Sequence, residues 1–292
     1  MKMNLTDITT IKSLLETADT GFKKSLGQNF LINPAVPKKI AASLKRDGEN
    51  PPNVLEIGPG IGTLTVELSA VAGRVAAVEI DGTLMPILEK TLAGCPNVKV
   101  INADILKTDI GKLAQEEFGG GEFSVCANLP YYITSPILMY LLEGDAKPRE
   151  IIIMVQKEVA QRLCSSPGSA EYGALTAAAA WFGECERLFA VSAGNFLPKP
   201  KVDSEVIRIT PFKSPPFKVS SGGTLRRVIR GAFARRRKTL VNSITAEFPN
   251  IEKERFVKIL SAMGLPADIR GERLSVERFA EMTLYIDGEI PL

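Results

Sequence analysis

Runs of β-branched and other apolar residues alternate with amphipathic stretches across the middle of the chain. The apolar runs predict strands at residues 54–57, 75–78, 98–101, 123–127 and 151–155. Helical composition and spacing lie between them, at residues 63–72, 83–92 and 136–142. Strands that alternate with helices are typical of a doubly wound α/β fold with a parallel sheet. Ligands of such folds bind at the carboxyl ends of the strands.

Two further extended segments follow a helix predicted over residues 172–182. They cover residues 187–191 and 204–209, on either side of a proline-rich loop that begins at Phe196. Because the connection is short, the two segments are predicted to pair antiparallel. The sheet is therefore expected to contain seven strands, mostly parallel, with an antiparallel strand at one edge.

The last part of the chain has helical periodicity only. Residues 211–223 are rich in proline and glycine, as linkers are. Helices are predicted beyond them at residues 224–248, 252–263 and 275–285. Ser275 is placed to cap the last helix, with Leu274 and Phe279 as a hydrophobic staple. We expect an α/β domain of residues 1–212, with an N-terminal arm over about the first 35 residues, and an all-helical domain of residues 213–292.

The composition excludes several classes of function. No apolar run reaches the ~18 to 20 residues needed to cross a bilayer, and the first residues lack the order of a secretory signal. A cytoplasmic protein is therefore expected. The sequence contains no histidine, which excludes a Ser-His-Asp triad and every histidine-ligated metal. Catalysis has to proceed without the commonest general base.

The cysteines also argue against a metal centre. Cys95, Cys126, Cys164 and Cys185 are widely spaced and form no C-x-x-C pair. This spacing favours reduced thiols in the core over metal ligands or a disulfide framework. No metal is expected.

A glycine-rich loop follows the first predicted strand. Glu56 precedes Gly58, Gly60 and Gly62, and the loop opens the next helix. Glycines let the backbone approach a ligand closely. The spacing differs from the G-x-G-x-x-G of dinucleotide-binding folds, which argues against NAD. The alternative is a tight strand-to-helix turn that binds no ligand.

Acidic residues end the first three strands or lie next to their ends. Glu79 is placed to accept hydrogen bonds from the hydroxyls of a ribose, and Asp104 to reach an adenine amine. The alternative is that both are solvated strand ends. Glu56 needs a partner because it ends a buried strand. It either braces the glycine loop through backbone N–H groups or receives the cationic end of a cofactor.

Asn128, Leu129, Pro130 and Tyr131 follow the fourth strand directly. The Asn128 side-chain oxygen and a backbone carbonyl can accept hydrogen bonds from an exocyclic amine, while a base can stack on Tyr131. Accepting groups that draw the nitrogen lone pair out of ring conjugation prepare the amine for methyl transfer without a strong base. The segment predicts a site for an aminopurine or cytosine. A rigid turn with a core tyrosine is the alternative.

The proline-rich loop contributes three further candidates. Phe196 is expected to close the other face of the base, unless it is an aromatic of the core. Lys199 and Lys201 are expected to contact phosphates.

Taken together, the ordered motifs resemble those of the ribosomal RNA adenine dimethyltransferases. The resemblance rests on residues 27–31, 56–63, 128–131, 196–204 and 236–239, and it runs from about residue 20 to the end of the chain. It is strongest to the bacterial enzymes that modify 16S rRNA. The resemblance implies a class I, Rossmann-like methyltransferase fold that uses S-adenosylmethionine and releases S-adenosylhomocysteine.

The resemblance also implies a substrate and a set of cofactor contacts. The substrate is 16S rRNA in the 30S subunit or its precursor, where two adjacent adenosines of the hairpin loop near the 3′ end each receive two methyl groups. The implied contacts are Asn29, Leu31, Gly58, Glu79, Asp104 and Asn128, and Gln28, Glu56 and Gly60 complete the expected cofactor site. Asn29 and Leu31 follow from the resemblance alone. A monomer is expected.

The tail carries the excess of positive charge. Residues 213–292 contain 15 lysines and arginines against 9 acids, while residues 1–212 contain 21 against 24. Residues 224–240 contain no acid and have an amphipathic pattern, so we expect RNA to dock there. A solvated face and a membrane-surface helix are the alternatives. The basic residues are Arg226, Arg227, Arg230, Arg235, Arg236, Arg237 and Lys238.

Two other functions compete with this hypothesis. The 23S rRNA adenine methyltransferases of macrolide resistance share the glycine loop and an N-x-P-Y segment, but the tail and Leu129 favour the small-subunit enzymes. A non-catalytic RNA-binding assembly or transcription factor on the same scaffold is the second alternative. The intact Asn128, Tyr131 and Glu79 favour an enzyme.

Overall fold

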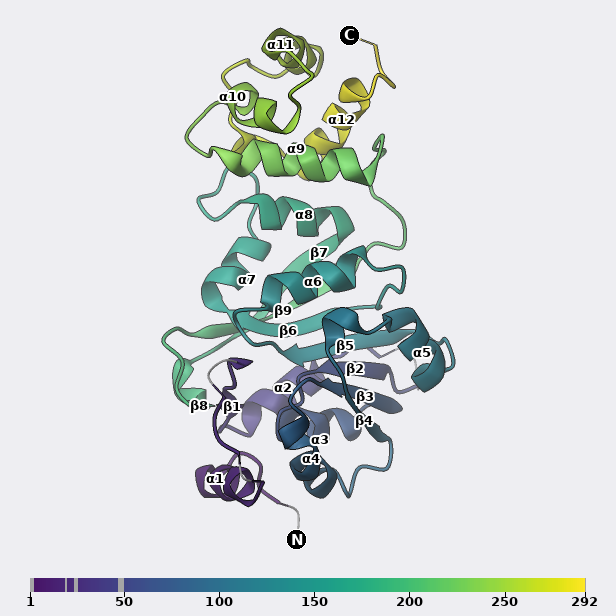
Figure 1. Ribbon diagram of the computed structural model, residues 1–292, viewed down its shortest axis with the longest axis vertical. Helices are drawn as coiled ribbons and strands as arrows, with labels where there is room; N and C mark the ends of the chain where they lie inside the picture. Colours follow the sequence, from purple (N-terminus) through teal and green to yellow (C-terminus); the bar gives the residue numbers. More distant parts are fainter. Residues whose placement is uncertain (1–2, 19, 24–25, 47–49, 292) are drawn as a thin grey trace. The chain divides into compact units, whose positions relative to one another are not determined.

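The apolar runs form a central sheet in the computed structural model, which describes residues 3–18, 20–23, 26–46 and 50–291. The strands are β2 Asn53–Ile57, β3 Arg74–Glu79, β4 Val98–Asn102, β5 Phe123–Asn128, β6 Ile151–Gln156, β7 Gly183–Val191 and β9 Ser204–Pro211. Their order across the sheet is β4-β3-β2-β5-β6-β9-β7 (Figure 1). Strands β2 to β6 pair in parallel, and β9 is antiparallel to β6.

The expected α/β class and the seven-stranded, mostly parallel sheet are confirmed. The antiparallel strand differs in its position, because β9 lies between β6 and β7 instead of at the edge. Its Val206, Ile207 and Ile209 are fully buried, which suits an inner strand. The alternation of exposed and half-buried residues along β7 suits the edge.

Helices connect the strands. They are α1 Ile8–Thr17, α2 Ala35–Ala42, α3 Thr63–Ser69, α4 Met85–Thr91, α5 Ile110–Phe118, α6 Thr134–Glu143 and α7 Lys157–Leu163, with short 3-10 turns η2 Gly82–Leu84, η3 Ile105–Lys107 and η4 Ala193–Asn195. Asp7 caps α1 and Asp109 caps α5, each by accepting a hydrogen bond from a backbone N–H. Neither helix was among those predicted from the pattern.

A second, two-stranded sheet joins distant segments of the chain. β1 Phe30–Leu31 pairs antiparallel with β8 Phe196–Leu197, and the Asn33 side chain donates to that of Asn195 over 2.8 Å. Leu31 and Phe196 enter one apolar cluster with residues of α2, α3 and the central sheet. The motif at residues 27–31 and the proline-rich loop are thus neighbours in the fold.

The chain divides into two compact units. Unit 1 comprises Met1–Ala160 and Cys185–Pro211, and unit 2 comprises Gln161–Glu184 and Phe212–Leu292. The structure therefore groups residues 161–184 with the C-terminal part, whereas the sequence predicts one boundary near residue 212. The reason is packing, since Tyr172 and Trp181 belong to the same apolar cluster as the C-terminal helices.

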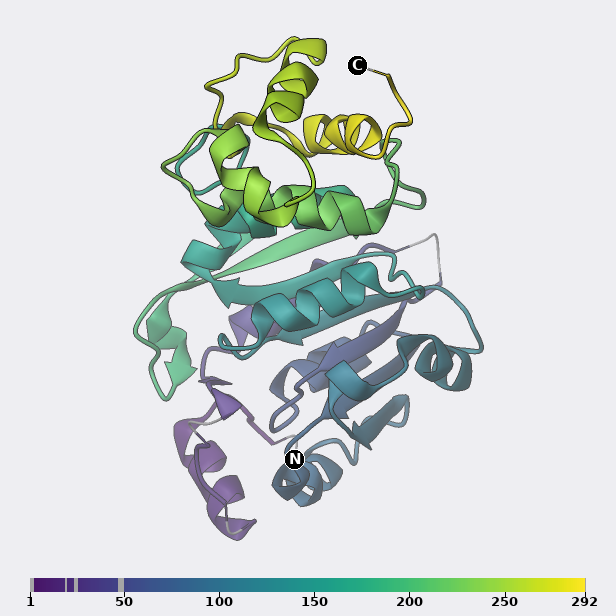
Figure 2. The same ribbon diagram turned by 45° about the horizontal axis from the view of Figure 1, so that its top comes forward.

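Unit 2 is helical. It contains α8 Ala174–Phe182, α9 Gly222–Ala234, α10 Leu240–Ile244, α11 Lys253–Ala262 and α12 Val276–Ile286, with the 3-10 turns η5 Thr245–Glu247 and η6 Gly271–Arg273. Helix α9 contacts α8, α10 and α12 (Figure 2). Ser275 caps α12 as expected, and both residues of the predicted staple are buried.

The continuous helix predicted over residues 224–248 is wrong. α9 ends at Ala234, a turn follows, and α10 starts after Thr239, whose side chain caps it. The Ser243 hydroxyl accepts from the Arg235 N–H at 3.0 Å and donates to the Gly231 carbonyl at 2.6 Å. These bonds fold α10 back on α9, where Gly231 leaves no room for a Cβ beside Ile244.

The expectation of four reduced thiols also needs correction. Cys95 and Cys126 are free, whereas Cys164 and Cys185 are disulfide-bonded. In the described part of the chain, no helix is long and apolar enough to cross a membrane.

Candidate functional site

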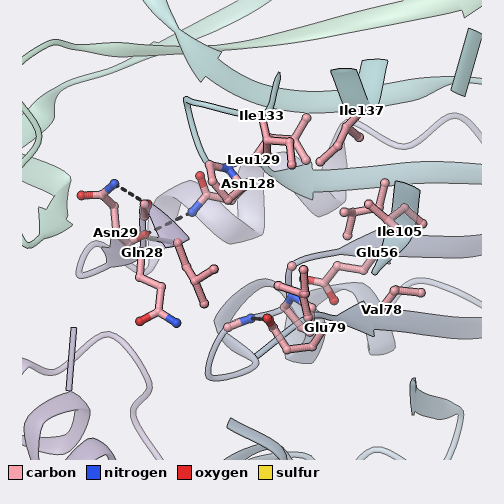
Figure 3. Close-up of a pocket in the computed structure, with 18 of the residues that line it drawn as sticks. Gln28, Asn29, Glu56, Val78, Glu79, Ile105, Asn128, Leu129, Ile133 and Ile137 are labelled. Atoms are coloured by element: carbon pink, nitrogen blue, oxygen red, sulfur yellow. Dashed lines mark hydrogen bonds between the residues drawn. The ribbon is translucent and has the colours of Figure 1, made fainter. Parts of the chain in front are cut away.

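A cleft lies at the carboxyl ends of β2, β3, β4 and β5 in unit 1 (Figure 3). It encloses about 1080 Å³, a volume that includes the part open to solvent. All the residues expected to contact a cofactor line it, together with the segment after β5. These residues are Gln28, Asn29, Leu31, Glu56, Gly58, Gly60, Glu79, Asp104, Asn128, Leu129, Pro130 and Tyr131.

The glycine loop between β2 and α3 brings the backbone to the cleft. The Gly58 N–H donates to the Val78 carbonyl over 2.9 Å, which continues the pairing of β2 with β3. Gly58 has a φ of +69°, and a Cβ built on it would meet nothing within 4 Å. The positive φ requires glycine, and the open space leaves this backbone accessible to a ligand.

Glu79 braces this loop. Its Oε2 accepts the Gly60 N–H at 3.0 Å and its Oε1 accepts the Asp81 N–H at 2.9 Å. The side chain is buried, and burial raises its pKa, opposed by the N–H groups of Asp81 and Gly60. Each carboxylate oxygen has a second lone pair, so the bracing bonds leave acceptors for a ligand hydroxyl. Sequence reasoning considered this bracing role for Glu56 instead.

Glu56 lies beside Glu79 on the adjacent strand (Figure 3). It is 1% exposed, and its Oε2 has no hydrogen-bond partner among the described residues. Burial raises the pKa of Glu56 to about 8; the Thr65 hydroxyl lowers it and the Glu79 carboxylate raises it further. At neutral pH the carboxyl group therefore holds a proton in the unliganded protein.

This proton predicts a pH-dependent stability. The folded state holds a proton on Glu56 up to about pH 8, whereas the unfolded chain releases it near the ordinary value of 4.5. The free energy of unfolding should therefore fall as the pH rises through this window. In Glu56→Gln, which has no proton to lose at this position, the decline should be smaller. Chemical denaturation at about pH 5, 6.5 and 8 measures both slopes, and equal slopes would contradict the assignment.

Asp104 and an apolar wall complete the opposite side of the cleft. Asp104 follows β4 and caps η3 by accepting the Leu106 N–H at 3.0 Å, and its side chain is 26% exposed. Ile80, directly after Glu79, also lines the cleft and is 52% exposed. Sequence reasoning missed Ile80, although an apolar residue between acids at a strand end was a visible signal.

A second acid, Asp81, was also missed. It accepts hydrogen bonds from Lys23 Nζ at 2.7 Å and from Gln28 Nε2 at 2.8 Å. Burial raises the pKa of Asp81, but the bonds from Lys23, Thr83 and Gln28 outweigh it and the net shift is downward. Asp81 thus ties the segment before β1 to the end of β3. Gln28 takes part in this tie while it lines the cleft.

Asn128 is held by Asn29, the residue before β1. It is the last residue of β5, and its Nδ2 donates to the Asn29 carbonyl at 3.3 Å, while Asn29 Nδ2 donates to the Gly27 carbonyl at 2.9 Å. Figure 3 shows the Asn128 amide nitrogen directed at Asn29. Because the amide is planar, its oxygen points away from β1 and is available as an acceptor.

Tyr131 is held from β9. Its hydroxyl lies 2.7 Å from Ser204 Oγ. Burial raises the pKa of Tyr131, so the hydroxyl stays protonated in the physiological range. Leu129, between the two polar positions, is buried at 1% exposure and anchors the turn in the core.

Phe196 does not face the cleft. Its ring is 2% exposed and packs in an apolar cluster with Leu31, Val36 and Ile40. The structure thus shows the alternative considered for it, a core aromatic, because the pairing of β8 with β1 turns the ring inward. Lys199 and Lys201 are exposed on the loop that follows.

The seven basic residues predicted to contact RNA in unit 2 are all exposed, but they differ in their contacts. Arg230 forms an ion pair with Glu247, Arg227 stacks over the Phe248 ring at 4.1 Å, and Arg236 pairs with Glu272 at 3.0 Å. Arg226 lies on α9 beside Arg227. By contrast, Arg235, Arg237 and Lys238 lie in the turn after α9 and form no ion pair with any described residue.

A family model and curated relatives match nearly the whole chain. The model described as "Ribosomal RNA adenine dimethylase" matches residues 20–287. A "Ribosomal RNA small subunit methyltransferase A" from Geobacillus sp. (strain WCH70) is 42% identical over 275 residues, which cover 93% of this chain and 94% of the relative. The protein of the same name from Bacillus mycoides (strain KBAB4) is 43% identical over 276 residues, with 93% and 94% covered.

Two solved structures share the fold. A dimethyladenosine transferase from Plasmodium falciparum superimposes with a TM-score of 0.74 at 26% identity, covering 89% of this chain and 98% of that structure. The 23S rRNA methyltransferase ErmE superimposes with a TM-score of 0.65 at 26% identity, covering 88% and 99%. The expected class I methyltransferase fold is thereby confirmed.

Proposed function

The chain belongs to the ribosomal RNA adenine dimethylase family, and from this premise we propose that it dimethylates the 6-amino groups of two adjacent adenosines in 16S rRNA. The methyl donor of the family is S-adenosylmethionine. The proposed target is the hairpin loop near the 3′ end of the rRNA, in the 30S subunit or its precursor. We further propose that the protein acts as a monomer in the cytoplasm, as a step of small-subunit biogenesis.

One observation carries the proposal: Asn128 shares a cleft with Gly58, Glu79 and Asp104. S-adenosylmethionine supplies an electrophilic methyl group on a sulfonium. The residues of the chain have to bring an amine to that methyl and make its nitrogen lone pair available. Asn128 Oδ1 and the backbone after it accept the two N–H groups of the amine, which draws the lone pair out of conjugation with the ring and toward the methyl group. The proton then leaves the alkylated nitrogen for solvent, so no histidine is needed.

The cleft has groups that fit each part of the cofactor. Glu79 accepts from the ribose hydroxyls with the lone pairs that its bracing bonds leave unused, and Asp104 accepts from the adenine amine. The backbone at Gly58 and Gly60 and the residues Gln28, Asn29 and Leu31 surround the rest. Glu56 Oε2, buried and unpartnered, suits the cationic methionine end.

Labelled S-adenosylmethionine tests the reaction and its substrate together. The protein is incubated with unmethylated 30S subunits or with naked 23S rRNA, and the nucleosides are then analysed. Label in dimethyladenosine from the small subunits alone is expected. Label from 23S rRNA would identify the activity named for the ErmE structure, and RNA binding without any transfer would identify a non-catalytic role.

We propose that the turn after α9 contacts rRNA phosphates, together with Lys199 and Lys201 on the loop of unit 1. The support is that Arg235, Arg237 and Lys238 are exposed and form no ion pair within the part of the chain that the structure describes. An arginine already held by a carboxylate loses that pairing when it binds a phosphate, so it contributes less. Arg230 and Arg236 are therefore secondary contacts. Arg227 is held by the Phe248 ring and the Glu247 backbone carbonyl instead of a carboxylate, and Arg226 extends the same helix face.

This distinction predicts different effects for two variants with the same loss of charge. Arg235→Ala/Arg237→Ala should weaken binding to 30S subunits about tenfold or more in low salt and should flatten the salt dependence of the binding constant. Arg230→Ala/Arg236→Ala should have a smaller effect. Filter binding between about 50 and 200 mM salt measures both. If the two variants lose the same RNA affinity, total charge and not the turn determines binding. As a control, neither variant should change the affinity for the cofactor.

A further inference from the structure

The two groups proposed to hold the target base are fixed by different segments of unit 1. Asn128 is oriented by the Asn29 carbonyl, on the N-terminal side. Tyr131 is joined through its hydroxyl to Ser204, which begins β9. Tyr131 lies in a turn, not in a helix or strand. The local chain therefore leaves the direction of the side chain open, and the contact at the far end of the ring fixes it.

Ser204 is a rigid anchor. It is fully buried, and it pairs with Gln156 in the register of β9 with β6. The residue before it is fixed twice, because the Asp203 carbonyl accepts the Lys157 N–H at 2.9 Å and its Oδ1 accepts the Ala193 N–H at 2.9 Å. Because the sheet fixes the position of the Ser204 hydroxyl, the hydrogen bond forms only when the Tyr131 side chain points toward it.

The bond also satisfies a buried polar group. Ser204 Oγ is away from water, so the Tyr131 hydroxyl is its partner in place of solvent. A ring that swings out of the cleft breaks this bond and leaves the serine hydroxyl unpaired, which is unfavourable. The contact therefore restrains the ring at the orientation seen here.

We propose that Ser204 is a positioning residue for the reaction, which fixes the direction of the Tyr131 side chain and so the place of the ring on which the target adenine stacks. The inference rests on the proposed function. Ser204 does not touch the base and acts only through Tyr131. A preset ring removes the need to order the side chain when the base arrives, which favours the reactive orientation of the amine.

A double-mutant cycle tests this inference. Tyr131→Phe keeps the stacking ring and loses the hydroxyl, while Ser204→Ala loses the partner without changing the strand. We expect each single variant to lower kcat/KM for 30S methylation by about five- to tenfold, as the loss of one hydrogen bond would. The double variant should be no worse than either single variant. The affinity for S-adenosylhomocysteine should remain unchanged.

Tyr140→Phe is the matched control. The Tyr140 hydroxyl donates to the Thr108 carbonyl at 2.7 Å in the same unit, and the residue does not line the cleft. This variant should lose a similar bond and keep full methyl transfer. If transfer falls as much in Tyr140→Phe as in Tyr131→Phe, the effect is one of general stability and the inference is overturned.

The remaining outcomes separate the inference from the proposed function. If the losses in the two single variants multiply in the double variant, Ser204 does not act through Tyr131 and the inference is wrong. If the wild-type protein transfers no methyl to 30S subunits, the proposed function fails and the inference fails with it. In that case, the same double-mutant cycle measured by thermal unfolding still shows whether the hydrogen bond couples Tyr131 to Ser204. Tyr131→Phe leaves the sheet untouched, so it remains informative even if Ser204→Ala misfolds.

Discussion

Asn128→Ala is expected to abolish detectable methyl transfer while the protein remains folded. Removing one preorganised group that acts on the reacting atoms costs about two to three orders of magnitude in kcat. The side chain is only half-buried and donates a single bond of 3.3 Å, so its loss removes little from the packing. Single-turnover transfer to 30S subunits, together with a thermal unfolding curve, measures both effects.

Asn128→Asp separates the two tasks of this side chain. The carboxylate keeps an acceptor for the target amine, but it cannot donate to the Asn29 carbonyl. Activity between that of wild type and that of Asn128→Ala is therefore expected. If Asn128→Ala retains more than about a tenth of the wild-type rate, Asn128 is not the group that prepares the amine.

Glu79→Gln is expected to weaken the binding of S-adenosylhomocysteine by about 100-fold. Hydrogen bonds to a charged group contribute roughly 1.5 to 3 kcal/mol each, and the substitution removes the charge that would receive the ribose hydroxyls. It also places an amide N–H against the N–H of Gly60 or of Asp81, which frees the glycine loop. Isothermal titration with S-adenosylhomocysteine gives the dissociation constant directly.

Glu117→Gln provides the control for a buried acid in the same unit. Glu117 is 3% exposed, pairs with Lys99 at 2.5 Å and lies outside the cleft. This variant should be less stable and bind the ligand with unchanged affinity. A Glu79→Gln protein that binds as tightly as wild type would remove Glu79 from the cofactor site and leave only its bracing role.

The inner strands of the central sheet were predictable because each is an apolar run that the fold buries on both faces. The carboxyl ends of parallel strands meet at one edge of the sheet, so the closeness of Glu56, Glu79, Asp104 and Asn128 followed from their positions after strands. No helix or loop had to be placed correctly for that inference. This is why the expected cofactor contacts and residues 128–131 all line one cleft, whereas Phe196, which was predicted from a loop, does not.

Features that depend on tertiary contacts were not predictable. The break after Ala234 arises from side-chain bonds of Thr239 and Ser243 and from the close approach of α10 to Gly231. No glycine or proline marks the turn itself. Likewise, the sequence does not show whether Phe196 faces a ligand or packs in the core, because this depends on the pairing of β8 with β1.

The exchange of roles between two acids has a similar origin. Both Glu56 and Glu79 end buried strands, and the sequence pattern does not show which carboxylate faces the N–H of Gly60. The structure assigns that bond to Glu79 and shows no hydrogen-bond partner for Glu56 Oε2 among the residues that it describes. Only the geometry of the adjacent strands β2 and β3 shows that Glu79, and not Glu56, binds the glycine loop.

The hydrogen bond between Tyr131 and Ser204 of β9 also has a consequence for the chain during its synthesis. During synthesis, the glycine loop, Glu79 and Asn128 all leave the ribosome before Ser204 does. An incomplete chain has the strands that form the cofactor cleft, but it lacks the strand that anchors the tyrosine. Competence to receive a base is therefore expected to arise late in translation, when β9 inserts beside β6, whereas competence to bind the methyl donor can arise earlier.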